Sequence, residues 1–155
     1  MMSMVYLPTK INNIVRLSVP IVLFFTAVLT SCSATDESGK FDFAKATQYW
    51  SSTDKSWNEE ELRALEQGRR VYRKNCAACH GKKGAGDATI GAPSLLNNAI
   101  IKGDINYHIA LIKKGKNQMP AFAQVLTDDE MLNVAAYERN AWGNHDYRIF
   151  DLFGK

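Results

Sequence analysis

The sequence predicts an all-α domain that follows an export signal and a polar tether. Apolar residues recur at spacings of three and four in three segments, which is the period of an amphipathic helix. No segment of useful length alternates with a period of two, so no strand is predicted. The 155 residues are 46% hydrophobic and 23% charged, which is the ordinary range for one globular domain.

Residues 1–31 have the form of a lipoprotein signal peptide. Lys10 and Arg16 precede an apolar run over residues 17–29, and no acidic residue lies in this leader. The alternative is a transmembrane helix. However, the run of about 15 residues is shorter than the roughly 20 that cross a bilayer, and Pro20 interrupts it.

The leader ends with an aliphatic residue, two small residues and Cys32, a pattern that resembles the lipidation site of bacterial lipoproteins. Cys32 is then the lipid-bearing N-terminus. The alternatives are a cysteine in an uncleaved anchor or a free thiol. Because this modification supplies at least two acyl chains, it holds a protein stably on a membrane. We therefore expect a cell-envelope protein, anchored in a membrane and facing the periplasm or the outer side of the cytoplasmic membrane.

Residues 32–56 are expected to form a flexible tether, because Ser, Thr, Asp and Lys are frequent and no period is sustained. Scattered aromatic residues argue against complete disorder. Trp50 and Trp57 are expected to dock on the domain or on a partner. The folded domain is predicted to span residues 57–155.

The first long helix is predicted to begin near Asn58, with three glutamates in its first turn, where acidic groups complement the helix dipole. Gly68 lies on its apolar face and would let another helix cross closely. Spacings of three and four define this face: Leu62, Leu65, Gly68, Tyr72 and Cys76.

Two further helices follow a glycine-rich loop at residues 81–91. The first is predicted over residues 104–114, with Gly115 as its stop. The second begins at a capping box that opens on Thr127. Its apolar side is formed by Met131, Val134, Ala135 and Tyr137.

Residues 76–80 read Cys-Ala-Ala-Cys-His, which is the attachment pattern of a covalent haem c. The thiols of Cys76 and Cys79 add to the haem vinyl groups, and His80 reaches the iron from one face. The competing interpretation is half of a zinc site, which needs a second Cys or His pair at matching spacing. The sequence contains no such pair. We therefore predict one haem c, covalently bound.

Met119 is the best candidate for the sixth iron ligand, because Pro120 stiffens the loop that must hold the thioether. Met131 lies in an apolar helix face, where core packing is expected. His108 and His145 are rival ligands. A His/Met pair raises the reduction potential relative to two histidines and closes both axial positions.

A closed coordination sphere favours an electron carrier rather than an enzyme. The main alternative is a haem peroxidase or gas-binding sensor with an open sixth position. A third possibility is a structural role, in which the haem domain supports an assembly and transfers no electrons.

Over residues 58–144 the chain resembles a class I monohaem cytochrome c, on Gly68, the haem motif, the 91–95 stretch Gly-Ala-Pro-Ser-Leu and Met119-Pro120. The resemblance implies the class I cytochrome c fold, with helices wrapped around one covalent haem c. It also implies that the first and last helices cross near Gly68. The carbonyl of Pro93 is expected to accept a hydrogen bond from His80 and so orient its ring.

The last helix ends in a stretch, residues 137–144, that is similar to the cytochrome c domain of subunit II of caa3-type oxidases. It also resembles the monohaem lipoprotein cytochrome of alternative complex III. Both resemblances imply a respiratory membrane complex as partner, either an oxidase or a quinol-oxidising complex, served as a fixed subunit or as a mobile carrier.

The charge distribution adds a hint about docking. Six lysines and only two aspartates lie between Cys76 and Met119. A positive rim around a haem edge would steer the domain to an acidic partner. The alternative is a set of solvated lysines that keep the protein soluble. Two of the chain's bases lie in the leader, so the remainder is close to neutral and no nucleic-acid partner is expected.

Overall fold

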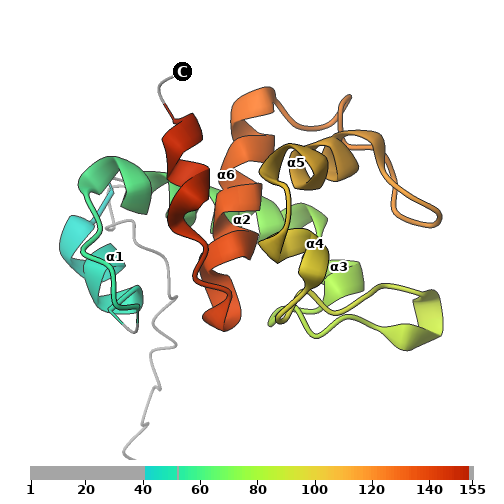
Figure 1. Ribbon diagram of the computed structural model, residues 1–155, viewed down its shortest axis with the longest axis horizontal. Helices are drawn as coiled ribbons and strands as arrows, with labels where there is room; N and C mark the ends of the chain where they lie inside the picture. The colour runs from blue at the N-terminus through green and yellow to red at the C-terminus, as the bar shows by residue number, and fades with distance from the viewer. Residues whose placement is uncertain (1–40, 52, 154–155) are drawn as a thin grey trace, which may run out of the picture. The chain divides into compact units, whose positions relative to one another are not determined.

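The computed structural model describes residues 41–51 and 53–153, which fold into helices joined by loops (Figure 1). The predicted signal peptide and Cys32 lie outside these residues. In the described ranges the secondary structure is helical, with isolated bridges and no strand, which confirms the all-α prediction. The elements are α1 (Phe43–Tyr49), α2 (Glu59–Asn75), α3 (Ala77–His80), η1 (Ala88–Ile90), α4 (Ala99–Lys102), α5 (Ile105–Lys114), α6 (Asp128–Asn140), η2 (Ala141–Gly143) and η3 (Tyr147–Leu152).

Helix α2 begins where its sequence predicts. The side chain of Asn58 accepts a hydrogen bond from the Glu61 amide, and the Glu61 carboxylate accepts one from the Asn58 amide. This capping box satisfies amides that the first turn leaves unpaired. The helix ends at Asn75 and Cys76 is its C-cap, so the end of the helix positions the first cysteine of the motif.

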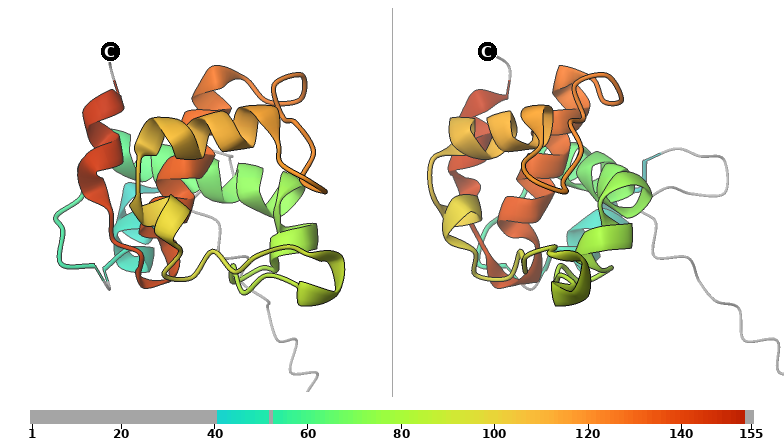
Figure 2. Two further views of the ribbon diagram at one scale, coloured as in Figure 1. Left: turned by 45° about the vertical axis from the view of Figure 1, so that its right-hand side comes forward. Right: turned by 90° about the vertical axis from the view of Figure 1, so that its right-hand side faces the viewer.

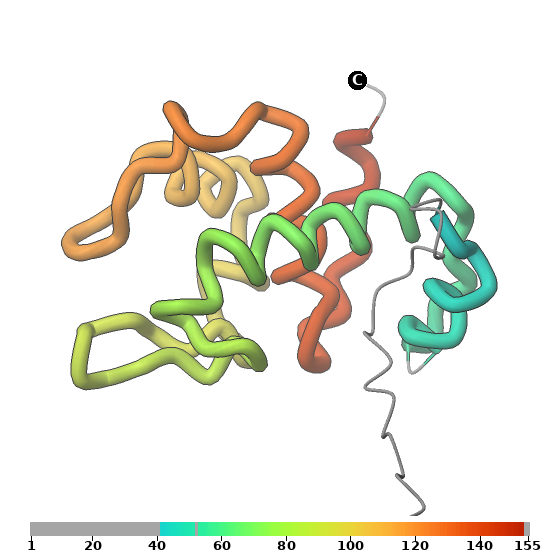
Figure 3. The backbone as a smooth tube through the Cα atoms, turned by 180° about the vertical axis from the view of Figure 1, so that it is seen from behind, coloured from blue at the N-terminus to red at the C-terminus, as the bar shows by residue number. Residues whose placement is uncertain are grey.

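The crossing of α2 and α6 forms the centre of the fold, as Figure 3 shows from behind. Gly68 lies at the crossing. A Cβ atom there would be 1.9 Å from the backbone oxygen of Asn133 and 2.8 Å from the Cβ of Tyr137. The close approach expected at Gly68 is therefore confirmed.

Helices α5 and α6 also begin at the expected signals. Asp104 caps α5 and Thr127 opens a capping box with Glu130 on α6. Gly115 ends α5 with a φ of +70°, and a Cβ atom there would be 2.4 Å from the Met119 carbonyl oxygen. This glycine therefore lets the following loop fold back closely on the helix end.

Part of the stretch predicted as a tether is helical and packs on the domain. Asp42 caps α1 by accepting a hydrogen bond from the Lys45 amide, and Ala46 and Trp50 are buried. The ring of Trp50 packs edge-on against Trp57 and Tyr137, with centroids 6.1 and 6.0 Å apart. Burial of this indole docks the segment on the domain, as expected for Trp50 and Trp57.

A C-terminal element that the sequence did not predict packs against α6. Within η3, Tyr147 and Phe150 contact the ring of Trp57, with centroids 5.4 Å apart in each pair. The buried guanidinium of Arg139 binds the Asp146 carboxylate and donates to the Gly103 carbonyl at 2.8 Å. These contacts hold the last described segment against the domain.

Within the described ranges, no helix is both long enough and apolar enough to cross a bilayer.

Candidate functional site

A cavity of about 590 Å³ opens beside the Cys-Ala-Ala-Cys-His motif, which is the size range of cofactor pockets. The loop after α3 and the loop after α5 project on the same side of the molecule (Figure 2). Both loops contribute to the lining, together with α4, α5 and α6. The apolar part of the lining includes Leu95, Ile100, Ile101, Leu111, Ile112 and Phe122.

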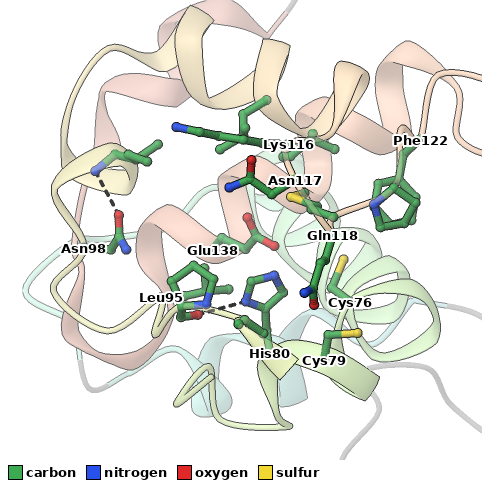
Figure 4. A pocket seen from close by; sticks show the side chains of 18 of the residues that line it. Cys76, Cys79, His80, Leu95, Asn98, Lys116, Asn117, Gln118, Phe122 and Glu138 are labelled. Atoms are coloured by element: carbon green, nitrogen blue, oxygen red, sulfur yellow. Dashed lines mark hydrogen bonds between the residues drawn. The ribbon is translucent and has the colours of Figure 1, made fainter. Parts of the chain in front are cut away.

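His80 faces the cavity in a fixed orientation. Its Nδ1 atom donates to the Pro93 carbonyl oxygen at 3.0 Å, because a carbonyl can only accept (Figure 4). This bond leaves Nε2 as the nitrogen with a free lone pair, which is the form that binds a metal. The contact expected between Pro93 and His80 is present.

The loop that carries Pro93 is held by close backbone approaches. The Tyr72 hydroxyl donates to the Gly81 carbonyl at 2.7 Å, and the Leu95 amide donates to the Gly84 carbonyl at 2.8 Å. Gly84 has a φ of +71°, and a Cβ atom there would lie 2.7 Å from the Trp142 ring. The acceptor of the His80 bond is therefore positioned by the core helices.

Cys76 and Cys79 both line the cavity as free thiols. The amides of Cys79 and His80 donate to the Cys76 carbonyl at 3.1 and 2.9 Å, so a single helical turn presents all three side chains. Burial raises the pKa of the Cys76 thiol, and the nearby carboxylate of Glu138 raises it further. Cys76 is buried whereas Cys79 is exposed.

Met119 also lines the cavity, from the loop after α5. The amides and carbonyls of Lys116 and Met119 pair with each other at 2.9 and 3.1 Å, which closes a tight turn around Asn117. Asn117 adopts a φ of +54°, a left-handed conformation that asparagine tolerates. The turn holds the methionine at the cavity, as its predicted role requires.

The rival candidates for the sixth ligand differ in their surroundings. Met131 is buried in the core, as expected, and His145 is exposed, with its ring stacked on Tyr147. His108 does line the cavity, but its Nε2 atom is 2.9 Å from a carboxylate oxygen of Glu138. Met119 and His108 thus both line the cavity, and the Nε2 atom of His108 already has a carboxylate partner.

The sequence interpretation missed Glu138 as part of this cavity. Glu138 and His108 are 5% and 3% exposed and both line it. A signal was present: Glu138 follows Met131, Val134 and Ala135 at helical spacing, so a charge falls on the apolar face of the last helix.

The residues present fit a covalent haem. Two thiols at the haem-attachment spacing line an apolar cavity together with one imidazole that has a free nitrogen and one thioether. The imidazole and the thioether are a borderline and a soft donor, which suit iron in a porphyrin. The six lysines counted between Cys76 and Met119 are all exposed, and Lys116 lines the cavity itself.

Sequence comparisons point to one family. A family profile described as "Cytochrome C oxidase, cbb3-type, subunit III" matches residues 63–137. Cytochrome c6 of Parathermosynechococcus lividus is 41% identical over 76 residues, which cover 47% of this chain and 85% of that protein. The cbb3-type cytochrome c oxidase subunit CcoP of Azospirillum brasilense is 36% identical over 86 residues, covering 52% of this chain but only 29% of that subunit.

Two solved structures are also similar. Cytochrome c6 from the diatom Phaeodactylum tricornutum has 34% identity and a TM-score of 0.42, covering 48% of this chain and 88% of that one. Cytochrome cL from Methylophaga aminisulfidivorans has 20% identity and a TM-score of 0.45, covering 70% and 71%.

Proposed function

Because the chain belongs to the family of class I c-type cytochromes, we propose that it is a membrane-tethered electron carrier with one haem c ligated by His80 and Met119. The observation that carries this proposal is the shared cavity, where the two thiols, the imidazole and the thioether face one space. The bound haem supplies a one-electron iron couple.

Each residue of the site has a distinct task. Cys76 and Cys79 form the thioether bonds that hold the porphyrin, and the rigid end of α2 fixes their position. His80 would bind the iron through Nε2, and the Pro93 carbonyl holds its ring in orientation. Met119 would supply a second iron ligand, a thioether, which would favour the reduced state.

A closed coordination sphere leaves outer-sphere electron transfer as the chemistry. Met119 at the cavity argues against the alternative of a haem peroxidase or gas-binding sensor, which needs an open position. No further observation favours that alternative.

The proposed partner is a respiratory membrane complex, either a terminal oxidase or a quinol-oxidising complex. The similarity to an oxidase subunit supports this class, and so does the resemblance of residues 137–144 to caa3-type oxidases and alternative complex III. The exposed lysines would favour docking on an acidic surface of the partner. Lipidated Cys32 is proposed to keep the domain at the membrane, in the cell envelope.

The ligand assignment is tested with Met119→Ala. The ferric protein is expected to show the weak long-wavelength absorption of methionine-ligated haem, and Met119→Ala is expected to lose it while keeping the covalent haem. Met131→Leu is the matched control, because Met131 packs in the core. An unchanged spectrum in Met119→Ala would show that another residue ligates the iron.

The two attachment tasks are separated with cysteine variants. Cys76→Ser is expected to lose most covalently bound haem, measured by haem staining after denaturing electrophoresis. Cys32→Ser is expected to keep the haem but to move from the membrane fraction to the soluble one. Retention of Cys32→Ser on the membrane would contradict the proposed anchor without touching the haem site.

A further inference from the structure

A carboxylate and an imidazole meet in the cavity wall and have no task in the proposed ligand set. His108 on α5 and Glu138 on α6 are both buried, and Nε2 lies 2.9 Å from Oε2. Both residues line the cavity. Figure 4 shows the Glu138 carboxylate pointing into the same space as the His80 ring.

The pair combines a buried nitrogen that has no partner with a buried carboxylate. In the described part of the chain, the Nδ1 atom of His108 is buried without a hydrogen-bond partner. With one proton the pair has no net charge, and without it the pair carries one negative charge in a desolvated place. The buried pair of Glu66 and Arg69 differs, because a guanidinium stays charged at every physiological pH.

The charge of Glu138 reaches the haem attachment site. After burial itself, this carboxylate is the largest cause that raises the pKa of the Cys76 thiol. It acts in the same direction on the pKa of the Tyr72 hydroxyl, again after burial. Glu138 is therefore near enough to Cys76 for its charge to act on a group at the haem attachment site.

We propose that His108 and Glu138 form a proton-binding site whose occupancy is coupled to the electron held in the cavity. The inference rests on the proposed function, which supplies the haem. When a one-electron donor reduces the ferric iron to ferrous, one proton from solvent joins the pair. When the electron passes to an acceptor, the proton returns to solvent.

The physical reason is electrostatic and reciprocal. An added electron makes the cavity more negative, and at low effective dielectric this strengthens proton binding by the pair. By linkage, a bound proton stabilises the added electron by the same free energy. The reduction potential is therefore expected to fall as pH rises through the range where the pair loses its proton.

Other charged or titratable groups lie on the elements that carry the pair or line the cavity. They are Tyr72 on α2, Lys102 on α4, Asp104 and Tyr107 on α5, Lys116 in the next loop and Arg139 on α6. All but Tyr72 and Arg139 are exposed, so solvent screens them. Burial raises the pKa of Tyr72, and Arg139 is bound to Asp146. The haem propionates are the remaining competitor.

The test is the midpoint potential of the purified haem protein, measured between about pH 5 and about pH 9. At fixed ambient potential, the ratio of reduced to oxidised protein is expected to fall by up to about tenfold per pH unit, which is about 59 mV for one electron. Glu138→Gln retains the shape and a hydrogen-bonding group but binds no proton. It is expected to keep, at every pH, the higher ratio that the unmodified protein shows at low pH.

Two controls separate this effect from a general disturbance. Glu66→Gln also neutralises a buried glutamate, but one that lies outside the cavity lining, bound to Arg69 at 2.6 Å. Asp128→Asn neutralises an exposed carboxylate that pairs with Lys113. Both variants are expected to retain the pH dependence of the unmodified protein.

Two results would overturn the inference: a potential independent of pH in the unmodified protein, or an equal slope in Glu138→Gln, which would assign the proton to the propionates. Where a variant fails to fold, proton uptake is measured on the unmodified protein with a pH-indicator dye during reduction in unbuffered solution. Reduction without uptake contradicts the inference. Absence of haem from a folded protein contradicts the proposed function instead.

Discussion

At the scale of single residues, the hydroxyl of Tyr72 links the core to the loop that carries Pro93. It donates to the Gly81 carbonyl at 2.7 Å, and burial raises its pKa, so it stays a donor at neutral pH. Tyr72 therefore contributes to the position of the acceptor that orients His80.

Removing this hydroxyl has a measurable cost. Tyr72→Phe is expected to lower the free energy of unfolding by about 1 kcal/mol, because one hydrogen bond is lost and the Gly81 carbonyl loses a donor. Chemical denaturation followed by the haem absorbance measures the change. Tyr107→Phe is the control, since Tyr107 is exposed, and an equal loss in both variants would contradict the assigned role.

At the scale of elements, the crossing of α2 and α6 depends on the absence of a side chain at Gly68. A Cβ atom there would meet the backbone of Asn133, which cannot move aside as a flexible side chain does. Gly68→Ala is therefore expected to destabilise the protein by about 3 kcal/mol. Thermal unfolding measures this loss of stability. Gly143→Ala is the control for backbone strain, because φ is +81° there but an added Cβ atom meets nothing within 4 Å. A smaller loss in Gly68→Ala than in Gly143→Ala would contradict the steric account.

Trp50, which directly follows helix α1, is the largest buried side chain of this segment. Trp50 is 4% exposed and packs on Trp57 and Tyr137. Trp50→Ala is expected to cost about 3 kcal/mol and to make the segment around α1 sensitive to proteases. Limited proteolysis followed by mass spectrometry locates the cleavage, and Phe43→Ala is the control because Phe43 is largely exposed. Equal protease resistance in all three proteins would show that α1 is held by other contacts.

The elements that sequence reasoning predicted well are those specified locally. The first long helix has its capping residue, its apolar period and its glycine within one segment, so Asn58 and Gly68 could be interpreted without tertiary information. Helix α1 could not be predicted in this way, because the ring partners of Trp50 are Trp57 and Tyr137, and Tyr137 is distant in the sequence. The pairing of His108 with Glu138 joins residues 30 positions apart and was equally hidden.

At the scale of the whole molecule, the C-terminal segment is closed by a buried ion cluster with a defined pH response. Burial by itself raises the pKa of Asp146, but hydrogen bonds and charges of Arg148 and Arg139 outweigh it and hold the pKa below the usual value. A carboxyl with a lowered pKa in the folded state contributes stability above its unfolded pKa of about 3.9, and that contribution is lost as pH falls through the folded pKa.

Asp146→Asn is therefore expected to be less stable than the unmodified protein at neutral pH by about 3 kcal/mol, because Arg139 is left buried without its counter-ion. The difference is expected to shrink as pH falls below about 4, where the native carboxyl also becomes neutral. Thermal unfolding at several pH values measures both. A difference that is constant with pH would show that the cluster acts through packing alone.

The central claim is that both axial positions of the haem iron are closed by residues of this chain, His80 and Met119. The most direct measurement mixes the reduced protein with carbon monoxide and follows the Soret absorbance, with Met119→Ala as the open-site reference. We predict slow or absent binding in the unmodified protein and rapid binding in the variant. Rapid binding in both, without displacement of a ligand, would contradict the account.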